Sequence, residues 1–391
     1  MRNIILFDPV EARGNLLPLT YTRPVALLRH GILTVAEKWQ HEIEGRYSFE
    51  TQDYLSIKYP LELADDDDNL FIAGNVEPDG LLVEAVKALQ PGEAITCKGA
   101  LVAARGDRGR CTATEWDGDI LAINQLYDIF MTNGEAVMRD YRMLTAGRKS
   151  QELSDSCRLI GSPELPDGTP ALFIEEGATV EGAIVNVKNG PVYVGRGAEI
   201  MEGACLRGPV ALCEHAVVNM GGKIYGPTTL GPYCKVGGEL NNVVMTGYSN
   251  KAHDGFLGNA VIGEWCNLGA GCTASNLKNT YAPIRLWSFV KQSFVKTGLQ
   301  FCGLIMGDHS KAGINTMFNT ATVIGVGVNF YGAGFPRTFI PSFTEGSTAG
   351  MKPVDLDRFY DTASRMMARR HIELTPIDKE ILYQVKLTGE K

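Results

Sequence analysis

The stretch "VGRGAEIMEGACLRGPVALCEHAVVNMGGKIYGPTTLGPYCKV", Val194–Val236, carries an aliphatic residue at every sixth position. These positions are Val194, Ile200, Leu206, Leu212, Val218, Ile224, Leu230 and Val236. Neither the helical period of about 3.6 residues nor the strand period of about 2 produces this spacing. A six-residue step is typical of a short strand plus a turn, repeated so that each aliphatic side chain stacks on its counterpart one coil away. The stretch therefore predicts a β-helix.

A second set of small or compact side chains follows four residues after most of the aliphatic ones. Its members are Ala198, Ala204, Val210, Ala216, Thr228 and Cys234. Cys266 and Cys272 lie six residues apart further along the chain. Because free cysteine packs as a small hydrophobe, we interpret these thiols as packing residues rather than metal ligands.

The six-residue register breaks twice. It resumes with Phe256, Ile262 and Leu268, and then again with Met306, Ala312, Phe318, Ile324 and Phe330. We expect the intervening segments, Gly237–Gly255 and Ala274–Ile305, to be insertions that form loops on the surface of the solenoid. His253 belongs to the first of these segments, whereas His215 and His309 lie in register.

The rest of the chain predicts two further regions. Residues 1–150 alternate strand-like runs with helical stretches, which favours an α/β layer fold. Residues 151–345 form the predicted β-helix domain. Residues 346–391 form a C-terminal helical tail, in which Leu356–Leu374 has a helical pattern that would cover the open end of the solenoid.

Charge and composition exclude some classes of partner. The net charge is −8 and the pI is about 5.4, so the field of the protein repels a polyanion and we expect no nucleic-acid partner. No apolar run approaches the roughly 20 residues that a bilayer requires, so we expect no membrane partner. Because the first residues do not read as a signal peptide, we expect a cytoplasmic protein.

One segment resembles a known enzyme family. The pattern His253-x-x-Phe256-Leu257-Gly258-Asn259-Ala260-x-Ile262-Gly263, followed by Asn267-Leu268-Gly269-Ala270-Gly271 and Ser275-Asn276, is similar to the acetyltransferase half of the GlmU-like bifunctional enzymes. "SNLKN" looks closer to an alternate bacterial and archaeal branch of that group. The resemblance implies a left-handed parallel β-helix of the hexapeptide-repeat acyltransferases, with acetyl-CoA as cosubstrate and homotrimeric assembly.

The same resemblance implies roles for individual residues. His253 falls on the general base, Asn267 and Asn276 fall on substrate-site asparagines, and the Ala270 backbone falls near acetyl-CoA or the oxyanion. Phe256 stands where the family has a tyrosine. A family lysine is replaced by asparagine, so we expect other cations to bind the sugar phosphate. The candidates are Lys251, Lys278 and Lys311.

The N-terminal region resembles a second family less completely. "LPLTYTRPVALL", Leu17–Leu28, is similar to a signature segment of sugar nucleotidyltransferases. The glycine-rich phosphate loop of that family is replaced by Glu11–Asn15, its lysine by Val25, and its metal-binding aspartate by Asn75. The resemblance assigns nucleotide binding to Arg13, Arg23 and Asn75. An active domain would also need magnesium, for which Asp79 or the run Asp65–Asp68 is a candidate.

These observations predict acetyl-CoA-dependent N-acetylation of an amino-sugar 1-phosphate, glucosamine 1-phosphate, coupled to uridylyl transfer from UTP when the N-terminal domain is active. The product of both steps would be UDP-N-acetylglucosamine. Two alternatives stay open. One is a nucleotidyltransferase of another sugar 1-phosphate with a structural β-helix, and the other is a non-catalytic sensor of sugar nucleotides.

Overall fold

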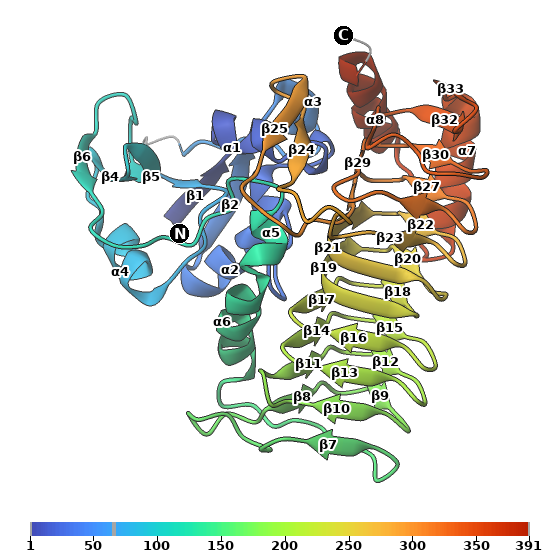
Figure 1. Cartoon of the computed structure of the whole chain (residues 1–391). Coiled ribbons are helices and arrows are strands. Elements are labelled where there is room, and N and C mark those ends of the chain that lie inside the picture. The colour runs from blue at the N-terminus through green and yellow to red at the C-terminus, as the bar shows by residue number, and fades with distance from the viewer. Residues whose placement is uncertain (1, 65–67, 390–391) are drawn as a thin grey trace. The chain divides into compact units, whose positions relative to one another are not determined.

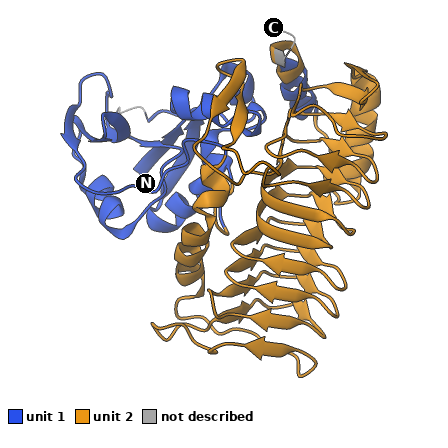
Figure 2. Cartoon of the chain, in the orientation of Figure 1, with its two compact units in different colours: residues 1–28, 33–126, 376–384 blue, residues 29–32, 127–375, 385–391 orange. Residues whose placement is uncertain are grey.

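The computed structural model describes residues 2–64 and 68–389. The chain divides into two compact units, coloured separately in Figure 2. Unit 1 comprises Met1–Leu28, Leu33–Leu126 and Pro376–Gln384, and unit 2 comprises Arg29–Ile32, Tyr127–Thr375 and Val385–Lys391. The predicted domain boundaries at residues 150 and 345 stay predictions. No helix in the described part of the chain is long and apolar enough to cross a membrane.

Unit 1 is an α/β layer structure, as predicted. Its mixed sheet has the order β2-β1-β3-β5-β4-β6, and β1 is parallel to both of its neighbours. The strands are β1 (Arg2–Phe7), β2 (Gly45–Glu50), β3 (Asn69–Ala73), β4 (Glu93–Cys97), β5 (Ala100–Arg105) and β6 (Thr112–Glu115). The helices are α1 (Val10–Asn15), α2 (Val35–Glu42), α3 (Asp53–Ser56) and α4 (Gly80–Ala88), with 3₁₀ turns η1 (Leu19–Tyr21) and η2 (Val25–Leu27).

The sequence has a helical pattern of apolar residues over Arg23–Trp39, and the structure divides this stretch. It forms the short turn η2 and then α2, because Thr34 and Glu37 form a capping box that starts a new helix. The Thr34 side chain accepts from the Glu37 N–H, and the Glu37 carboxylate accepts from the Thr34 N–H. A pattern of apolar residues alone does not reveal this restart.

Unit 2 contains a parallel β-solenoid with three faces, which confirms the predicted β-helix (Figure 1). Face A is formed by β8 (Leu172–Ile174), β11 (Val192–Val194), β14 (Val210–Leu212), β17 (Thr228–Leu230), the later halves of β19 (Glu239–Gly247) and β21 (Phe256–Glu264), β26 (Ile305–Met306), β29 (Val323–Ile324) and β31 (Phe339–Ile340). Face B is formed by β9 (Thr179–Val180), β12 (Glu199–Ile200), β15 (Val217–Val218), β18 (Lys235–Val236), β20 (Asn250–Lys251), β22 (Asn267–Leu268), β27 (Lys311–Ala312), β30 (Asn329–Phe330) and β32 (Thr344–Ser347). Face C is formed by β7 (Arg158–Ile160), β10 (Ile184–Asn186), β13 (Cys205–Arg207), β16 (Lys223–Tyr225), the first halves of β19 and β21, β23 (Thr273–Ala274) and β28 (Met317–Phe318).

The six-residue step moves the chain from one face to the next. Val194 points inward on face A, Ile200 on face B and Leu206 on face C, and all three are buried. Successive coils stack in register, so that Ile200 lies beside Val218 and Leu206 beside Ile224. The predicted small residues and the cysteines at 234, 266 and 272 are also buried in this core. The core is therefore three columns of apolar side chains.

The first break in register is not an insertion, contrary to the prediction. Residues 237–255 form a coil of the solenoid, with Leu240 inward on face C and Met245 inward on face A. The corner at Gly237 and Gly238 is short, and β19 runs through the next corner without a break, so the spacing changes while the stacking continues. Leu257, not Phe256, is the inward residue of the next coil.

The second break is a true insertion, as predicted. Ala274 is buried on the core side, and the chain then leaves the solenoid until Leu304 returns to the core. The excursion contains an antiparallel hairpin, β24 (Arg285–Ser288) and β25 (Ser293–Lys296).

Helices lie against the side and the end of the solenoid. The segment after Ile123 forms α5 (Asp128–Met131) and α6 (Asn133–Thr145), and Tyr141 of α6 packs edge-on against Tyr193 of face A. At the other end, α7 (Leu356–Ala368) packs Phe359 against Phe343, with ring centroids 5.2 Å apart. The strand β33 (Gly350–Pro353) pairs antiparallel with β32, and a further helix, α8 (Pro376–Gly389), follows α7.

Candidate active site

The column of inward residues on face B contains one lysine. Val236, Lys251 and Leu268 occupy equivalent positions on consecutive coils, and Lys251 is fully buried. Its ammonium donates hydrogen bonds to the backbone carbonyls of His253 and, at 3.0 Å, Asp254. Burial lowers the pKa of Lys251. Lys251 was expected as a surface cation for phosphate, whereas the structure places it inside the solenoid, where it ties down the turn that carries His253.

The turn of residues 252–255 lies at the corner between faces B and C. The side chain of His253 is exposed there. Gly255 adopts a φ of +123°, and a Cβ at this position would lie 3.3 Å from the Lys251 ammonium nitrogen. Glycine therefore gives the turn the conformation that it needs and leaves room for the lysine beneath it.

The turn that contains Ala270 stacks directly on the His253 turn. The Gly271 N–H donates to the Asp254 carbonyl at 3.1 Å. The Ala270 carbonyl accepts from the Asn315 N–H of the following coil, at 2.7 Å. Among the described residues no acceptor engages the Ala270 N–H. An exposed residue with an unengaged backbone N–H thus lies one coil away from the turn of His253.

Asn267 lies on the outer side of face B, in a polar row with Asn250 and Lys311. It pairs in register with Asn250 on one side and with Lys311 on the other. The side-chain oxygen of Asn250 is buried and has no hydrogen-bond partner among the described residues. A buried acceptor without a donor destabilises the fold. The Asn250 oxygen can therefore accept a hydrogen bond from a polar ligand that lies along this row.

Phe256 and Asn276 meet over Gly258. A Cβ at Gly258 would lie 2.5 Å from the Phe256 ring and 2.7 Å from the Asn276 amide nitrogen, so only glycine fits between them. Asn276 donates to the side-chain oxygen of Asn259 at 2.7 Å. The structure therefore brings His253, Phe256 and these amides onto two consecutive coils.

The two remaining candidate cations have different surroundings. Lys311 donates to the His309 carbonyl at 3.0 Å, and burial lowers its pKa. It has no carboxylate partner among the described residues, and it lies beside Asn267. Lys278 lies on the insertion and donates to the Pro283 carbonyl at 3.2 Å. Of the three predicted lysines, Lys311 is the one that combines partial exposure with a place in the polar row.

In unit 1, the predicted arginines are engaged by the protein itself. Arg13 lies 3.7 Å from the Asp8 carboxylate and donates to the Thr20 carbonyl and the Tyr54 hydroxyl at 3.2 and 3.0 Å. Arg23 is buried. Residues 10–15, which replace the glycine-rich loop, form the helix α1 and so do not provide a loop of free backbone amides. The two arginines therefore stabilise this region rather than line its cavity.

Asn75 does line a cavity of unit 1. This cavity has a volume of about 370 Å³ and is bordered by Glu11, Lys98 and Asn124, among others. The Asn75 amide donates to the Asn124 side-chain oxygen at 2.9 Å. The volume of this cavity suits a small-molecule ligand. Lys98 and Asn124 were not predicted, because only the fold brings the β4–β5 turn and residue 124 to Asn75.

The predicted magnesium ligands that the structure describes, Asp68 and Asp79, bind other groups of the protein. Asp79 caps α4 by accepting from the Leu82 N–H at 3.0 Å, and Asp68 pairs with Arg105 at 2.6 Å. Asp65, Asp66 and Asp67 lie outside the described residues. Within residues 2–64 and 68–389, no three or more His, Cys, Asp and Glu side chains group as metal ligands. We derive no step through a metal.

Asn250 and Asn259 also belong to the site but were not predicted. A signal for the inward position of Lys251, and so for the outward position of its neighbour Asn250, exists in the sequence, because residue 251 lies one six-residue step after Met245 and is a lysine where the core requires an aliphatic residue. This step can be recognised only when Met245 is known to lie in the core. The sequence does not show that, because the short corner before Leu240 changes the spacing.

Comparison with known proteins supports the two halves unequally. Residues 4–149 match a family described as sugar nucleotidyl transferase, which confirms that the N-terminal region is nucleotidyltransferase-like. A search of curated proteins gives no significant match.

Among solved structures, the chain is similar to a UDP-N-acetylglucosamine acyltransferase from Francisella novicida, with 14% identity, 56% of this chain and 76% of that chain covered, and a TM-score of 0.24. It is also similar to the acetyltransferase domain of PglB from Neisseria gonorrhoeae in complex with acetyl coenzyme A, with 12% identity, 90% and 100% covered, and a TM-score of 0.18. A third is the N-acyltransferase AntD from Bacillus cereus, with 11% identity, 51% and 89% covered, and a TM-score of 0.23.

Proposed function

We propose that the solenoid transfers the acetyl group of acetyl-CoA to the amine of an amino-sugar 1-phosphate, and that the sugar is glucosamine 1-phosphate. The observation that carries the proposal is the placement of His253. Its turn is tied from inside by Lys251 and lies one coil from the unengaged Ala270 N–H. A general base and an oxyanion donor on adjacent coils are the two groups that acyl transfer to an amine needs.

In the proposed reaction, the substrate amine attacks the thioester carbonyl while His253 takes a proton from its nitrogen. A C–N bond forms, and the negative charge on the carbonyl oxygen is stabilised by the Ala270 N–H. The C–S bond then breaks, and the imidazolium of His253 returns its proton to the leaving thiolate. A histidine suits both transfers, because imidazole accepts the proton in the first step and imidazolium donates it in the second.

The polar row of Asn250, Asn267 and Lys311 supports binding of the sugar phosphate. The unsatisfied oxygen of Asn250 would accept from a sugar hydroxyl or amine. The Lys311 ammonium lacks a carboxylate partner in the described part of the chain, so a phosphate would supply the missing negative charge. Phe256 contributes a ring without a hydroxyl group, together with the amide of Asn276.

The test is release of free thiol from acetyl-CoA in the presence of glucosamine 1-phosphate. We expect the wild type to release thiol above background and His253→Ala to lose this activity. His215→Ala is the matched control, since His215 lies on a regular coil with 44% of its side chain exposed. Equal background rates in the wild type and His253→Ala would overturn the proposal.

A second activity, uridylyl transfer from UTP to N-acetylglucosamine 1-phosphate, is favoured by the cavity at Asn75. This proposal is supported by the family match over residues 4–149 and by the position of Asn75 in the cavity wall. The helix at residues 10–15 and the internal partners of Arg13 oppose it. Loss of the reaction would leave unit 1 as a binding domain.

Pyrophosphate release with and without Asn75→Ala tests this second activity. We expect the variant to lose pyrophosphate release, while Gln90→Ala, at an exposed position of the same unit, retains it. If the wild type releases no pyrophosphate but still acetylates glucosamine 1-phosphate, the chain is an acetyltransferase with a nucleotide-binding or structural N-terminal region.

Homotrimeric assembly, a cytoplasmic location and the GlmU-like pairing of both reactions complete the proposal. A sensor without catalysis would bind sugar nucleotides and release neither thiol nor pyrophosphate, and a nucleotidyltransferase with a structural solenoid would release only pyrophosphate. The two assays together thus separate the proposed function from its alternatives.

A further inference from the structure

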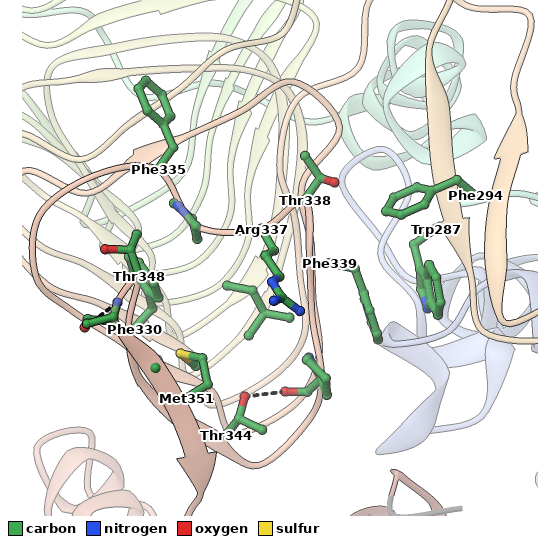
Figure 3. Close-up of a pocket in the computed structure, with 16 residues that line it drawn as sticks. Trp287, Phe294, Phe330, Phe335, Arg337, Thr338, Phe339, Thr344, Thr348 and Met351 are labelled. Carbon is green, nitrogen blue, oxygen red and sulfur yellow. Dashed lines mark hydrogen bonds between the residues drawn. The ribbon is translucent and has the colours of Figure 1, made fainter.

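A cavity of unit 2 lies at the C-terminal end of the solenoid. It has a volume of about 880 Å³, within the range of small-molecule sites. Its walls come from the hairpin β24–β25, the loop of residues 331–338, and the strands β31, β32 and β33 (Figure 3). None of the residues assigned above to acetyl transfer or uridylyl transfer lines it.

One wall of this cavity is aromatic. Trp287 stacks on Phe339 with ring centroids 4.1 Å apart, and Phe294 packs edge-on against Trp287 at 5.2 Å. Phe330 and Phe335 add further rings to the lining (Figure 3). Exposed aromatic faces bind planar bases by stacking, at about 1–3 kcal/mol per base.

The lining of the cavity contains a positively charged side chain and no negatively charged one. Arg337 reaches from the loop into the space between Phe339 and Met351 (Figure 3). It is exposed, and among the described residues it has no hydrogen-bond or ion-pair partner. None of the residues that line the cavity is a carboxylate. In a chain of net charge −8, an unpaired arginine in a lining that contains no acid favours an anionic ligand.

A second polar group in the wall also lacks a partner. The Trp287 indole N–H is buried and donates to no described residue. By contrast, the Thr344 and Thr348 hydroxyls already donate to backbone carbonyls, at 2.8 and 2.7 Å. An acceptor on a ligand would satisfy the indole, which a purely apolar occupant would not do.

From this combination we propose that the cavity binds a nucleotide, that is, an aromatic base that carries phosphate. The base stacks against the aromatic wall, the phosphate pairs with Arg337, and the indole N–H of Trp287 donates to a ligand oxygen or nitrogen. Two nucleotides have this chemistry in the proposed reactions: CoA and a uridine nucleotide.

The corner turns place this cavity on the same edge of the solenoid as His253. The turns that contain His253, Ala270, Asn315, Tyr331 and Thr348 follow one another along this edge. With coils about 4.8 Å apart, Thr348 lies about 19 Å from the His253 turn. A nucleotide held here would not occupy the acetyl-transfer site, although an elongated ligand would extend toward it.

The test is binding of CoA, adenosine 3′,5′-bisphosphate, UDP and inorganic phosphate to the full chain, measured by calorimetry. We expect one of the nucleotides to bind, and Arg337→Gln to weaken that binding by about 10-fold or more. Arg365→Gln, an exposed arginine of α7, should leave it unchanged. Binding of CoA and the bisphosphate identifies the acyl donor as the ligand, and binding of UDP identifies a uridine nucleotide.

Two further variants keep the test decisive. Trp287→Leu should weaken nucleotide binding by about 10-fold, with thermal unfolding as the check that the hairpin is intact. His253→Ala should bind the nucleotide as the wild type does, so a failure of the acetyl-transfer proposal is distinguishable from a failure of this one. The inference is overturned if no nucleotide binds, or if both Arg337→Gln and Trp287→Leu bind it with unchanged affinity.

Discussion

Two neighbouring coils of the solenoid differ at one inward position of face B. In the first coil the position is Val236, which fills the core as the repeat requires, and its corner contains only Gly237 and Gly238. In the next coil the position is Lys251, equally buried, and its corner contains His253. The scaffold thus gives up an aliphatic contact at the coil where Lys251 holds the turn of His253, the proposed general base.

The largest effect should come from the exposed residue of the second coil. His253→Ala removes the proposed general base, so we expect acetyl transfer to fall by about 10²–10⁴-fold. The rate of thiol release at saturating glucosamine 1-phosphate is the measurement. A loss below threefold would mean that the two coils do not differ in function.

Placing a lysine at the inward position of the first coil should destabilise the protein strongly. Val236→Lys puts an ammonium in the core without the two carbonyls that hold Lys251, so we expect the free energy of unfolding to fall by about 3–5 kcal/mol. Urea denaturation measures it. If the variant is as stable as the wild type, the second coil is not specially built for a lysine.

Replacing Lys251 by an apolar residue separates its proposed role in positioning His253 from a role in stability. Lys251→Met keeps the length of the side chain and removes a buried charge, so we expect a change in stability within about 1 kcal/mol. The turn of His253 loses two hydrogen bonds, and kcat for acetyl transfer should fall by about 10-fold with little change in KM. A fall in stability together with unchanged kcat would instead assign Lys251 a structural role.

The smallest effect concerns pH. Burial lowers the pKa of Lys251. As pH rises, Lys251 therefore loses its proton at a lower pH in the folded chain than in the unfolded chain. The cost of the buried charge is complete below the folded pKa and disappears as pH rises from that pKa toward 10.5, the usual lysine value. Wild type should therefore gain stability relative to Lys251→Met over this range, as measured by urea midpoints. A constant difference would show that the pKa of Lys251 is the same in the folded and the unfolded chain.

The repeat could be predicted from sequence because its stabilising contacts are periodic. Each aliphatic residue between Val194 and Val236 contacts an equivalent residue one coil away, so spacing alone identifies the core. Spacing failed at the short corner before Leu240 and at the adjacent apolar pair Phe256 and Leu257, where a shift of one residue reverses inside and outside.

The site was predictable only in part. His253, Asn267 and Ala270 are brought together because whole coils stack, so their separation along the chain was informative. The partners of Arg13 were not predictable, because Tyr54 reaches it from a distant helix. The same holds for Arg337 and Trp287, which an insertion and an irregular loop bring to one cavity.

The antiparallel strand at the end of the solenoid has a consequence for aggregation. A parallel solenoid that ended on an open coil would present strands ready to pair with the first coil of another molecule and so to grow into fibres. In this chain β33 folds back on β32, and a coil that approached it would meet a strand of the opposite direction. Because β33 occupies this edge of β32, another molecule cannot add a parallel strand there without displacing β33.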